Sequence, residues 1–205
     1  MGAQRLEDFS DMQLDVLKEI ANIGAGNATT SLSNLLNASV DMSVPTVKFL
    51  EFKELGDIIG GAENLVVGIL LTLEDDLDGM MMFIMEKDAA HKVVSRLMGR
   101  PAVTFDDFDE MDLSALKEIG NIIAGSYLSS ISSFTNMVIT SSVPYLSIDM
   151  AGAILSVPAI EFGKISDKAL LIQSRFGDEN TVVDGYYILI PTLESFNKIF
   201  SVLGL

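Results

Sequence analysis

The sequence predicts a single α/β (α+β) domain of two pseudo-two-fold-related halves. Each half is expected to contain a long helix, a β-meander and a short helix, with the strands joined in one sheet flanked by the helices. One observation is an internal repeat: LKEIANIGAGN at 17–27 returns as LKEIGNIIAGS at 116–126, an offset of 99 (116 − 17). Another is that LVVGILL and GMMMFIM are apolar at nearly every position, which predicts strands covered on both faces.

The repeat extends beyond the matching strings. EDFSDMQLD at 7–15 aligns without gaps to DDFDEMDLS at 106–114, again at an offset of 99. The Asp-Gly pair at 78–79 matches 184–185 at an offset of 106, so the second half holds about seven extra residues (106 − 99). We therefore expect one domain over residues 1–205, with repeat halves at about 7–99 and 106–204.

In each half, the sequence predicts the same order of helices and extended segments. Ser10 and Gln13 form a capping-box pattern at the start of the first long helix, and Asp109 and Asp112 occupy the equivalent places in the second. The expected helices cover about 10–36, 87–98, 109–134 and 192–203. The expected extended segments cover about 39–53, 64–74, 79–86, 137–148, 151–162, 168–176 and 182–190.

Composition excludes several classes of function. The 29 acidic and 13 basic residues give a net charge of −16, which argues against nucleic acid or an anionic membrane as a partner. There is no cysteine, so disulfides, thiolate nucleophiles and Cys-based zinc sites are excluded. No apolar segment resembles a signal peptide or approaches the ~20 residues of a spanning helix. We expect a cytoplasmic protein without membrane insertion.

A helical wheel separates two faces on each long helix. The expected core face carries Leu14, Leu17, Ile20, Ala21, Ala28, Leu32 and Leu35, and then Leu113, Leu116, Ile119, Ile123, Tyr127, Ile131 and Phe134. The opposite face carries Asp15, Glu19, Asn22, Gly26 and Ser33, and then Ser114, Glu118, Asn121, Gly125 and Ser132. Spacing of i, i+3 sets each Glu beside its Asn. Exposed polar residues usually serve only solubility, but here they stay alike between the halves while core residues such as Ala28 and Tyr127 differ.

The full spacing is more specific than either string. It reads Asp15-x3-Glu19-x2-Asn22-x22-Pro45 in the first copy and Ser114-x3-Glu118-x2-Asn121-x22-Pro144 in the second. Both copies resemble the D/S-x3-E-x2-N-x22-P signature of the CheC family of chemotaxis phosphatases, which also includes CheX and FliY. The repeat covers nearly the whole chain. A compact chain with two such sites is more similar to the CheC type than to CheX, which has one site.

The resemblance implies hydrolysis of the aspartyl phosphate on a CheY-type response regulator. It implies no cofactor of the chain's own, because Mg²⁺ is expected in the receiver's active site. It also implies a second partner, the receptor deamidase CheD. The spacing does not show which residues contact CheD, and the asymmetric segment 146–163 is one hypothesis, with Asp149 as its test position.

The signature residues then take distinct roles. Asn22 and Asn121 would hold the attacking water, because a carboxamide both donates and accepts hydrogen bonds. Glu19 and Glu118 would pair with the receiver's active-site Lys. The supporting residues are expected to be Asp15, Ser114, Pro45 and Pro144, with the prolines shaping the neighbouring strands.

Other interpretations remain open at this point. The chain could be a non-catalytic adaptor for a response regulator, a flagellar-switch component, or a scaffold that mainly sequesters or activates CheD. The stronger of the two sites is not decided. His91 is expected at the surface or boundary, without a metal or catalytic role.

Overall fold

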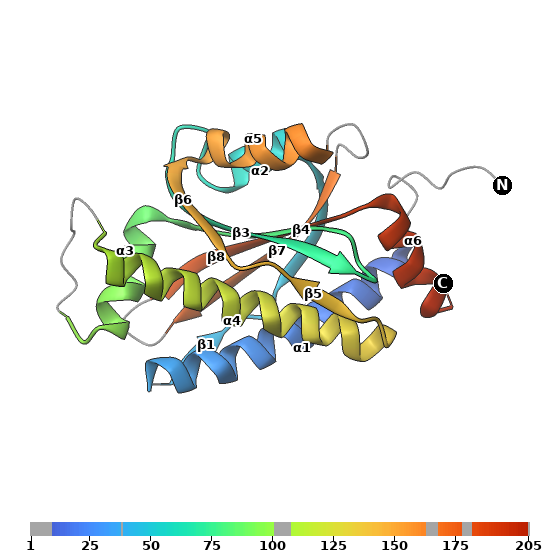
Figure 1. The fold of residues 1–205 in the computed structure, drawn as a ribbon, viewed down its shortest axis with the longest axis horizontal. Helices are drawn as coiled ribbons and strands as arrows, with labels where there is room; N and C mark the ends of the chain where they lie inside the picture. Colours follow the sequence, from blue (N-terminus) through green and yellow to red (C-terminus); the bar gives the residue numbers. More distant parts are fainter. Residues whose placement is uncertain (1–9, 38, 101–107, 163–167, 178–181, 205) are drawn as a thin grey trace.

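The computed structural model describes residues 10–37, 39–100, 108–162, 168–177 and 182–204. They form a single domain in which one curled antiparallel sheet is flanked by helices, so the predicted fold class is confirmed (Figure 1). The helices are α1 (Asp11–Leu36), α2 (Phe52–Ile58), α3 (Lys87–Leu97), α4 (Glu110–Thr135), α5 (Ala151–Phe162) and α6 (Leu193–Val202). The strands are β1 (Asp41–Met42), β2 (Thr46–Glu51), β3 (Leu65–Asp75), β4 (Gly79–Glu86), β5 (Ile139–Ser141), β6 (Tyr145–Met150), β7 (Lys168–Gly177) and β8 (Val182–Pro191).

The sheet interlocks the two halves of the chain. Its order is β1-β7-β8-β4-β3-β5, while β2 also pairs with β7 and β6 also pairs with β3. Each half therefore gives a strand to the other, since β2 pairs with a strand of the second half and β6 with one of the first. The central pair is β4 with β8, where Met81 faces Leu189.

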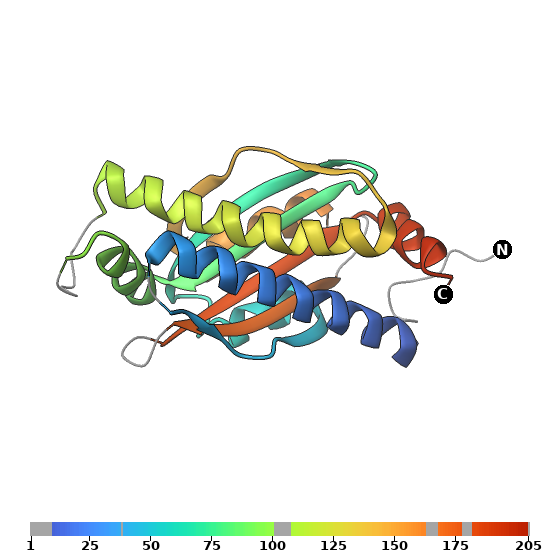
Figure 2. The ribbon, with the colours of Figure 1, turned by 90° about the horizontal axis from the view of Figure 1, so that it is seen from below.

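Helices cover both faces of the sheet. On one face α1 and α4 lie side by side and run in opposite directions (Figure 2). On the other face lie α2 and α5, while α3 and α6 lie toward opposite ends of the molecule (Figure 1). Residues Gly79–Met85 of β4 are buried without a break, as expected for a strand with apolar layers on both sides.

Two expectations about secondary structure are wrong. The segment 151–162, expected to be extended, is α5, and the segment expected to be extended over 39–53 gives way to α2 at Phe52. In α5 the run AGAILSVPAIEF is apolar nearly throughout and contains Pro158, so its pattern carries no helical period. The start of α2 had a readable signal, because Glu51 and Glu54 form a capping box.

The expected core faces of the long helices are mostly confirmed. Leu14, Leu35 and Leu113 are only half-buried, and Phe134 is 38% exposed, so its assignment to the core was wrong. Ser33 and Ser132 were expected on the exposed face but are half-buried. The Ser33 Oγ accepts from the Val40 N–H at 3.1 Å, and the Ser132 Oγ donates to the Met137 carbonyl at 2.7 Å.

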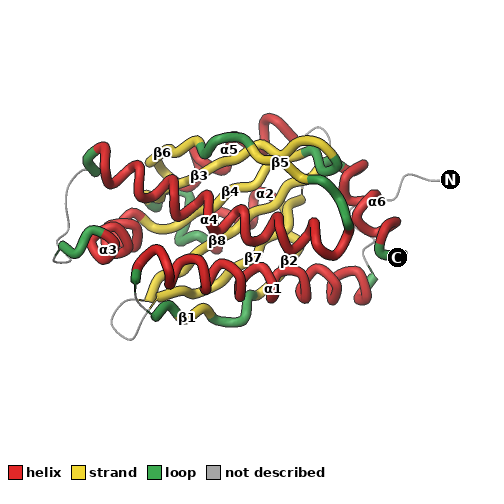
Figure 3. Tube along the Cα trace, turned by 60° about the horizontal axis from the view of Figure 1, so that its bottom comes forward, coloured by secondary structure: helices red, strands yellow, loops and turns green. Residues whose placement is uncertain are grey.

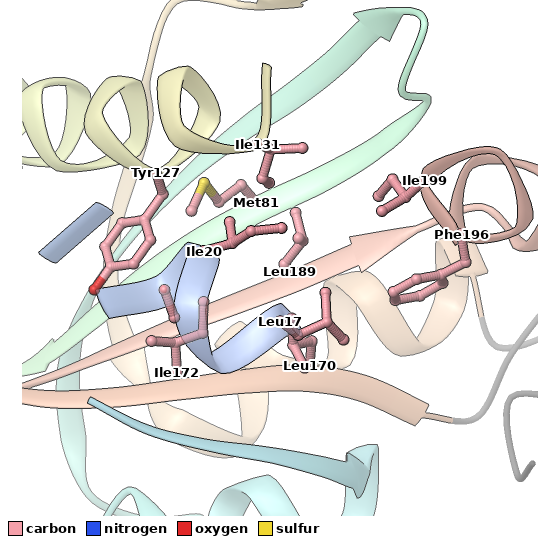
Figure 4. A pocket seen from close by; sticks show the side chains of 11 residues that line it. Leu17, Ile20, Met81, Tyr127, Ile131, Leu170, Ile172, Leu189, Phe196 and Ile199 are labelled. Atoms are coloured by element: carbon pink, nitrogen blue, oxygen red, sulfur yellow. The ribbon is translucent and has the colours of Figure 1, made fainter. Parts of the chain in front are cut away.

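Close contact between α1 and α4 depends on Gly24. A Cβ added there would lie 2.5 Å from Cδ1 of Tyr127. The Tyr127 ring also packs on Tyr187, with 4.8 Å between ring centroids. A cavity of about 20 Å³ remains between these helices, the sheet and α6, and apolar side chains such as Ile20 and Phe196 line it (Figure 4). Burial raises the pKa of the Tyr127 phenol, so this group stays neutral.

Candidate active site

A reciprocal capping box fixes the start of each long helix just before the signature residues. In α1 the Gln13 N–H donates to Ser10 Oγ at 3.3 Å, and the Ser10 N–H donates to Gln13 Oε1 at 2.9 Å. In α4 the Asp112 N–H donates to Asp109 Oδ1 at 2.8 Å, and the Asp109 N–H donates to Asp112 Oδ2 at 3.2 Å. Because each capping box fixes where its helix begins, it also fixes which of the following signature residues face outward.

The Glu and Asn side chains of the signature lie on the solvent side of both helices. Glu19, Asn22, Glu118 and Asn121 are exposed, and none of them makes a side-chain hydrogen bond within the described ranges. The two helices lie next to each other on one face of the molecule (Figure 3). Both pairs are therefore presented on the same helical layer.

Small residues keep this surface open. Gly26 and Gly125 follow one turn after the Asn residues, and a Cβ at either position would meet no heavy atom within 4 Å. The expected close approach of a partner surface is thus sterically available along both helices.

The second half brings its four signature residues to one hollow of about 410 Å³. Its lining contains Ser114, Glu118, Asn121 and Pro144, together with Leu97, Met98, Met111, Ala115 and Lys117. The lining groups that can be charged are one carboxylate and one ammonium. In the first half, Asp15 is exposed and its Oδ1 accepts from Lys18 Nζ at 2.8 Å, while Pro45 is buried.

The signature prolines lie in two β-bulges of the same form. Against β7, Met42 pairs with Phe176 and Thr46 with Gln173, so four residue steps oppose three. Against β3 the same mismatch occurs, with Ser141 on Leu73 and Tyr145 on Leu70. Each bulge contains Val-Pro, where the missing proline N–H removes no ladder bond. That the prolines shape the neighbouring strands stays a prediction. The second bulge brings Pro144 to the lining of the hollow.

A contact that the sequence did not reveal joins α3 to the start of α4. Arg100, just past the helix end at Gly99 (φ 61°), pairs with the buried carboxylate of Asp112 and lies 3.8 Å from Asp109 Oδ2. This contact holds the end of α3, and with it the wall formed by Leu97 and Met98, against the second hollow. Sequence reasoning identified Asp112 only as a capping residue, since nothing local marks a tertiary ion pair.

His91 was expected at the surface or boundary, but it is 4% exposed. Its ring stacks on Phe108, with 3.9 Å between centroids and 8° between planes. Burial lowers the pKa of His91, with a smaller contribution from Lys87. The residue packs α3 against the entry to α4 and lies outside the lining of the hollow.

The site offers positioning groups and no set of metal ligands. Among the described residues, no group of three or more His, Asp or Glu side chains could hold a metal ion. Over the same ranges, no helix is long and apolar enough to cross a membrane. A carboxylate, a carboxamide and an ammonium on one exposed helix face can bind a charged partner and orient a small molecule such as water.

Comparison with known proteins agrees with these observations. The model of the CheC-like family matches residues 12–49 and 111–148, the two stretches that hold all eight signature residues. The chain is 38% identical over 200 residues to the CheY-P phosphatase CheC of Bacillus subtilis, covering 96% of each protein.

Two solved structures have a similar fold. The crystal structure of Thermotoga maritima FliY matches with a TM-score of 0.76 at 22% identity, covering 96% of this chain and 98% of that one. A chain of the CheX-CheY-BeF3-Mg+2 complex from Borrelia burgdorferi matches with a TM-score of 0.51 at 22% identity, covering 82% of this chain and 95% of that one. With the sequence identity to CheC over nearly the full length, these findings lead to one conclusion: the chain belongs to the CheC-like family.

Proposed function

We propose that this protein is a phosphatase that hydrolyses the aspartyl phosphate of a CheY-type response regulator. The observation that carries the proposal is the doubled, exposed Glu-Asn pair on α1 and α4, set in the second half beside a hollow lined by its own signature residues. The B. subtilis relative, named as a CheY-P phosphatase, supports the same activity. We also propose that the two sites arose by duplication, because the element order α-β-β-α-β-β-α occurs twice.

The proposed chemistry requires only an oriented water. An acyl phosphate is already activated, and the receiver would supply Mg²⁺ and cationic groups around it. Asn22 or Asn121 enters the receiver's site and holds the attacking water in line with the scissile P–O bond, donating and accepting through one carboxamide. A carboxylate at this position would place an anion beside the phosphoryl group and oppose the approach.

Glu19 and Glu118 act one turn earlier on the same faces. Each is proposed to pair with the receiver's active-site Lys, which docks the helix and fixes the neighbouring Asn. Positioning of this kind can lower a barrier by several kcal/mol (about 7 or more in favourable intramolecular cases). No nucleophile or general base from this chain enters the step.

The test is phosphate release from a phosphorylated receiver with Mg²⁺. Asn22→Ala and Asn121→Ala should each leave partial activity, and the double variant should lose most of it while its far-UV circular dichroism is unchanged. Asn34→Ala, an exposed Asn farther along α1, is the matched control and should keep full activity. Wild-type turnover by the double variant would refute the mechanism. A chain that binds the receiver without accelerating phosphate loss would instead be an adaptor.

We further propose that CheD is a second partner, which contacts the region around β6 and α5. Asp149 is exposed at the end of β6, and α5 exposes Val157 and Ile160 to 44% and 71%. Charge reversal by Asp149→Lys and the change Ile160→Asp should each weaken CheD binding in calorimetry. Asp57→Lys on the neighbouring helix α2 is the control. Unchanged affinity for both variants would count against this surface.

A further inference from the structure

The two sites differ at a single signature position, and this changes the surroundings of a lysine three residues later. In the first site the Lys18 ammonium donates to Asp15 Oδ1 at 2.8 Å. In the second site Ser114 replaces the aspartate, and the Lys117 ammonium makes no ion pair or hydrogen bond with any residue that the structure describes. Lys117 instead lines the 410 Å³ hollow with Glu118 and Asn121.

Helix geometry brings the Lys117 ammonium near the Asn121 carboxamide, where the proposed reaction takes place. Residues 114, 117, 118 and 121 follow the i, i+3, i+4, i+7 spacing that forms one face of a helix. Lys117 lies one turn before Asn121, and its four-carbon stem allows the ammonium to reach the region around the carboxamide. Any negatively charged group brought to Asn121 therefore comes within reach of this cation.

The formal charges of the two sites differ for the same reason. Asp15, Lys18 and Glu19 sum to −1 (−1 + 1 − 1), whereas Ser114, Lys117 and Glu118 sum to 0 (0 + 1 − 1). The incoming phosphorylated aspartate is anionic, and the whole chain carries −16. An available ammonium at the contact face reduces this repulsion and can form a charge-assisted hydrogen bond with an oxyanion.

We propose that Lys117 is a contact for receiver oxyanions at the second site, and that Asp15 withdraws the equivalent Lys18 from this role at the first. The inference rests on the proposed phosphatase function and adds that the Asp or Ser of the signature sets the electrostatic character of each site. The second site is the one that docks the phosphorylated receiver more tightly at low ionic strength.

Single-site backgrounds make the inference testable. In Asn22→Ala, which leaves the second site, Lys117→Gln and Ser114→Asp should each raise KM about 2- to 5-fold with kcat little changed, the range expected for an exposed ion pair. The effect should shrink as salt increases. Lys92→Gln, an exposed lysine of α3 outside the hollow, is the control that removes the same charge and should leave KM unchanged.

The reciprocal change applies to the first site. In Asn121→Ala, which leaves that site, Asp15→Ser should lower KM about 2- to 5-fold, because it releases Lys18 and removes an anion. Equal KM values for Asp15→Ser and its parent, or for Lys117→Gln and its parent at low salt, would overturn the proposal. A purely structural role of Lys117 would move thermal stability and leave the salt dependence of KM unchanged.

Binding measurements identify the oxyanion and separate the two proposals. If Lys117→Gln weakens binding of the phosphorylated receiver alone, the ammonium contacts the phosphoryl group. If it weakens binding of phosphorylated and unphosphorylated receivers alike, the contact is with receiver carboxylates. Should neither single-site background release phosphate above the receiver's own rate, the phosphatase proposal fails, while receiver binding still tests Lys117. Unchanged binding of both receiver forms would then refute the contact.

Discussion

Substitution of two glycines in α1 by alanine should change stability in opposite directions. Gly24 is buried against α4, and a Cβ there would lie 2.5 Å from Tyr127 Cδ1 and 3.0 Å from its Cγ and Cε1. Gly26, two residues later on the exposed face, has nothing within 4 Å of the same added atom. The pair therefore separates helix propensity from packing within one helix.

The expected magnitudes follow from two terms. Replacing an interior helical Gly by Ala stabilises by about 1 kcal/mol. Overpacking a filled core costs about 1–3 kcal/mol, and Tyr127 cannot yield easily because its ring is buried against Tyr187. Gly24→Ala should therefore lower the free energy of unfolding by about 0–2 kcal/mol, whereas Gly26→Ala should raise it by about 1 kcal/mol.

Urea unfolding followed by far-UV circular dichroism measures both variants against the wild type. A third variant, Tyr127→Leu, tests the contact directly: in its background Gly24→Ala should lose its penalty, which appears as a coupling energy in a double-mutant cycle. The reasoning is refuted if Gly24→Ala stabilises as much as Gly26→Ala, or if the cycle shows no coupling between positions 24 and 127.

Two further predictions concern the joint between α3 and α4. Arg100→Gln leaves the buried Asp112 carboxylate without its cation, so it should lower the free energy of unfolding by about 2–4 kcal/mol. The control Arg175→Gln breaks an exposed ion pair and should lower it by at most about 1 kcal/mol. Equal losses in the two variants would contradict the burial argument. Burial lowers the pKa of His91 below the ordinary 6.5, so the unfolded state binds more protons and the wild type should lose stability as the pH falls below that value. His91→Phe keeps the stack on Phe108 but removes the titrating group. The urea midpoint should therefore fall less in this variant than in the wild type when the pH is lowered from above to below 6.5. The same pH dependence in both proteins would exclude His91 as a source of the effect.

The parts of the fold that were predictable have local causes. The long helices begin at capping boxes and carry a regular apolar period, so their bounds and the exposed direction of Glu19 and Asn22 could be read from the sequence. The β4 run was readable for a similar reason, since a strand with two covered faces is apolar throughout.

The remaining features depend on tertiary contacts between segments whose relative positions the sequence does not reveal. α5 is helical because its apolar residues Ile154 and Leu155 pack in the core beside the sheet, which outweighs the poor helix propensity of Val157 and Pro158. The pairing of Arg100 with Asp112 requires knowing that the end of α3 meets the start of α4. The bulges at Val44 and Val143 appear only from the register, although the fixed position of each proline was a signal that something local occurs there.

The exchange of strands between the halves has a consequence for biosynthesis. The β2–β7 pairs join residues that are 117 to 127 positions apart (168 − 51 and 173 − 46), and the β4–β8 pairs are similarly remote. A ribosome that has synthesised only the first half has made β2 without its partner β7, and β3 without β5 and β6, which pair with one of its edges. Such high contact order slows folding and leaves unpaired strand edges open to other nascent chains. The sheet can close only after β8 has emerged, so the first half cannot complete its part of the fold before the second half is made.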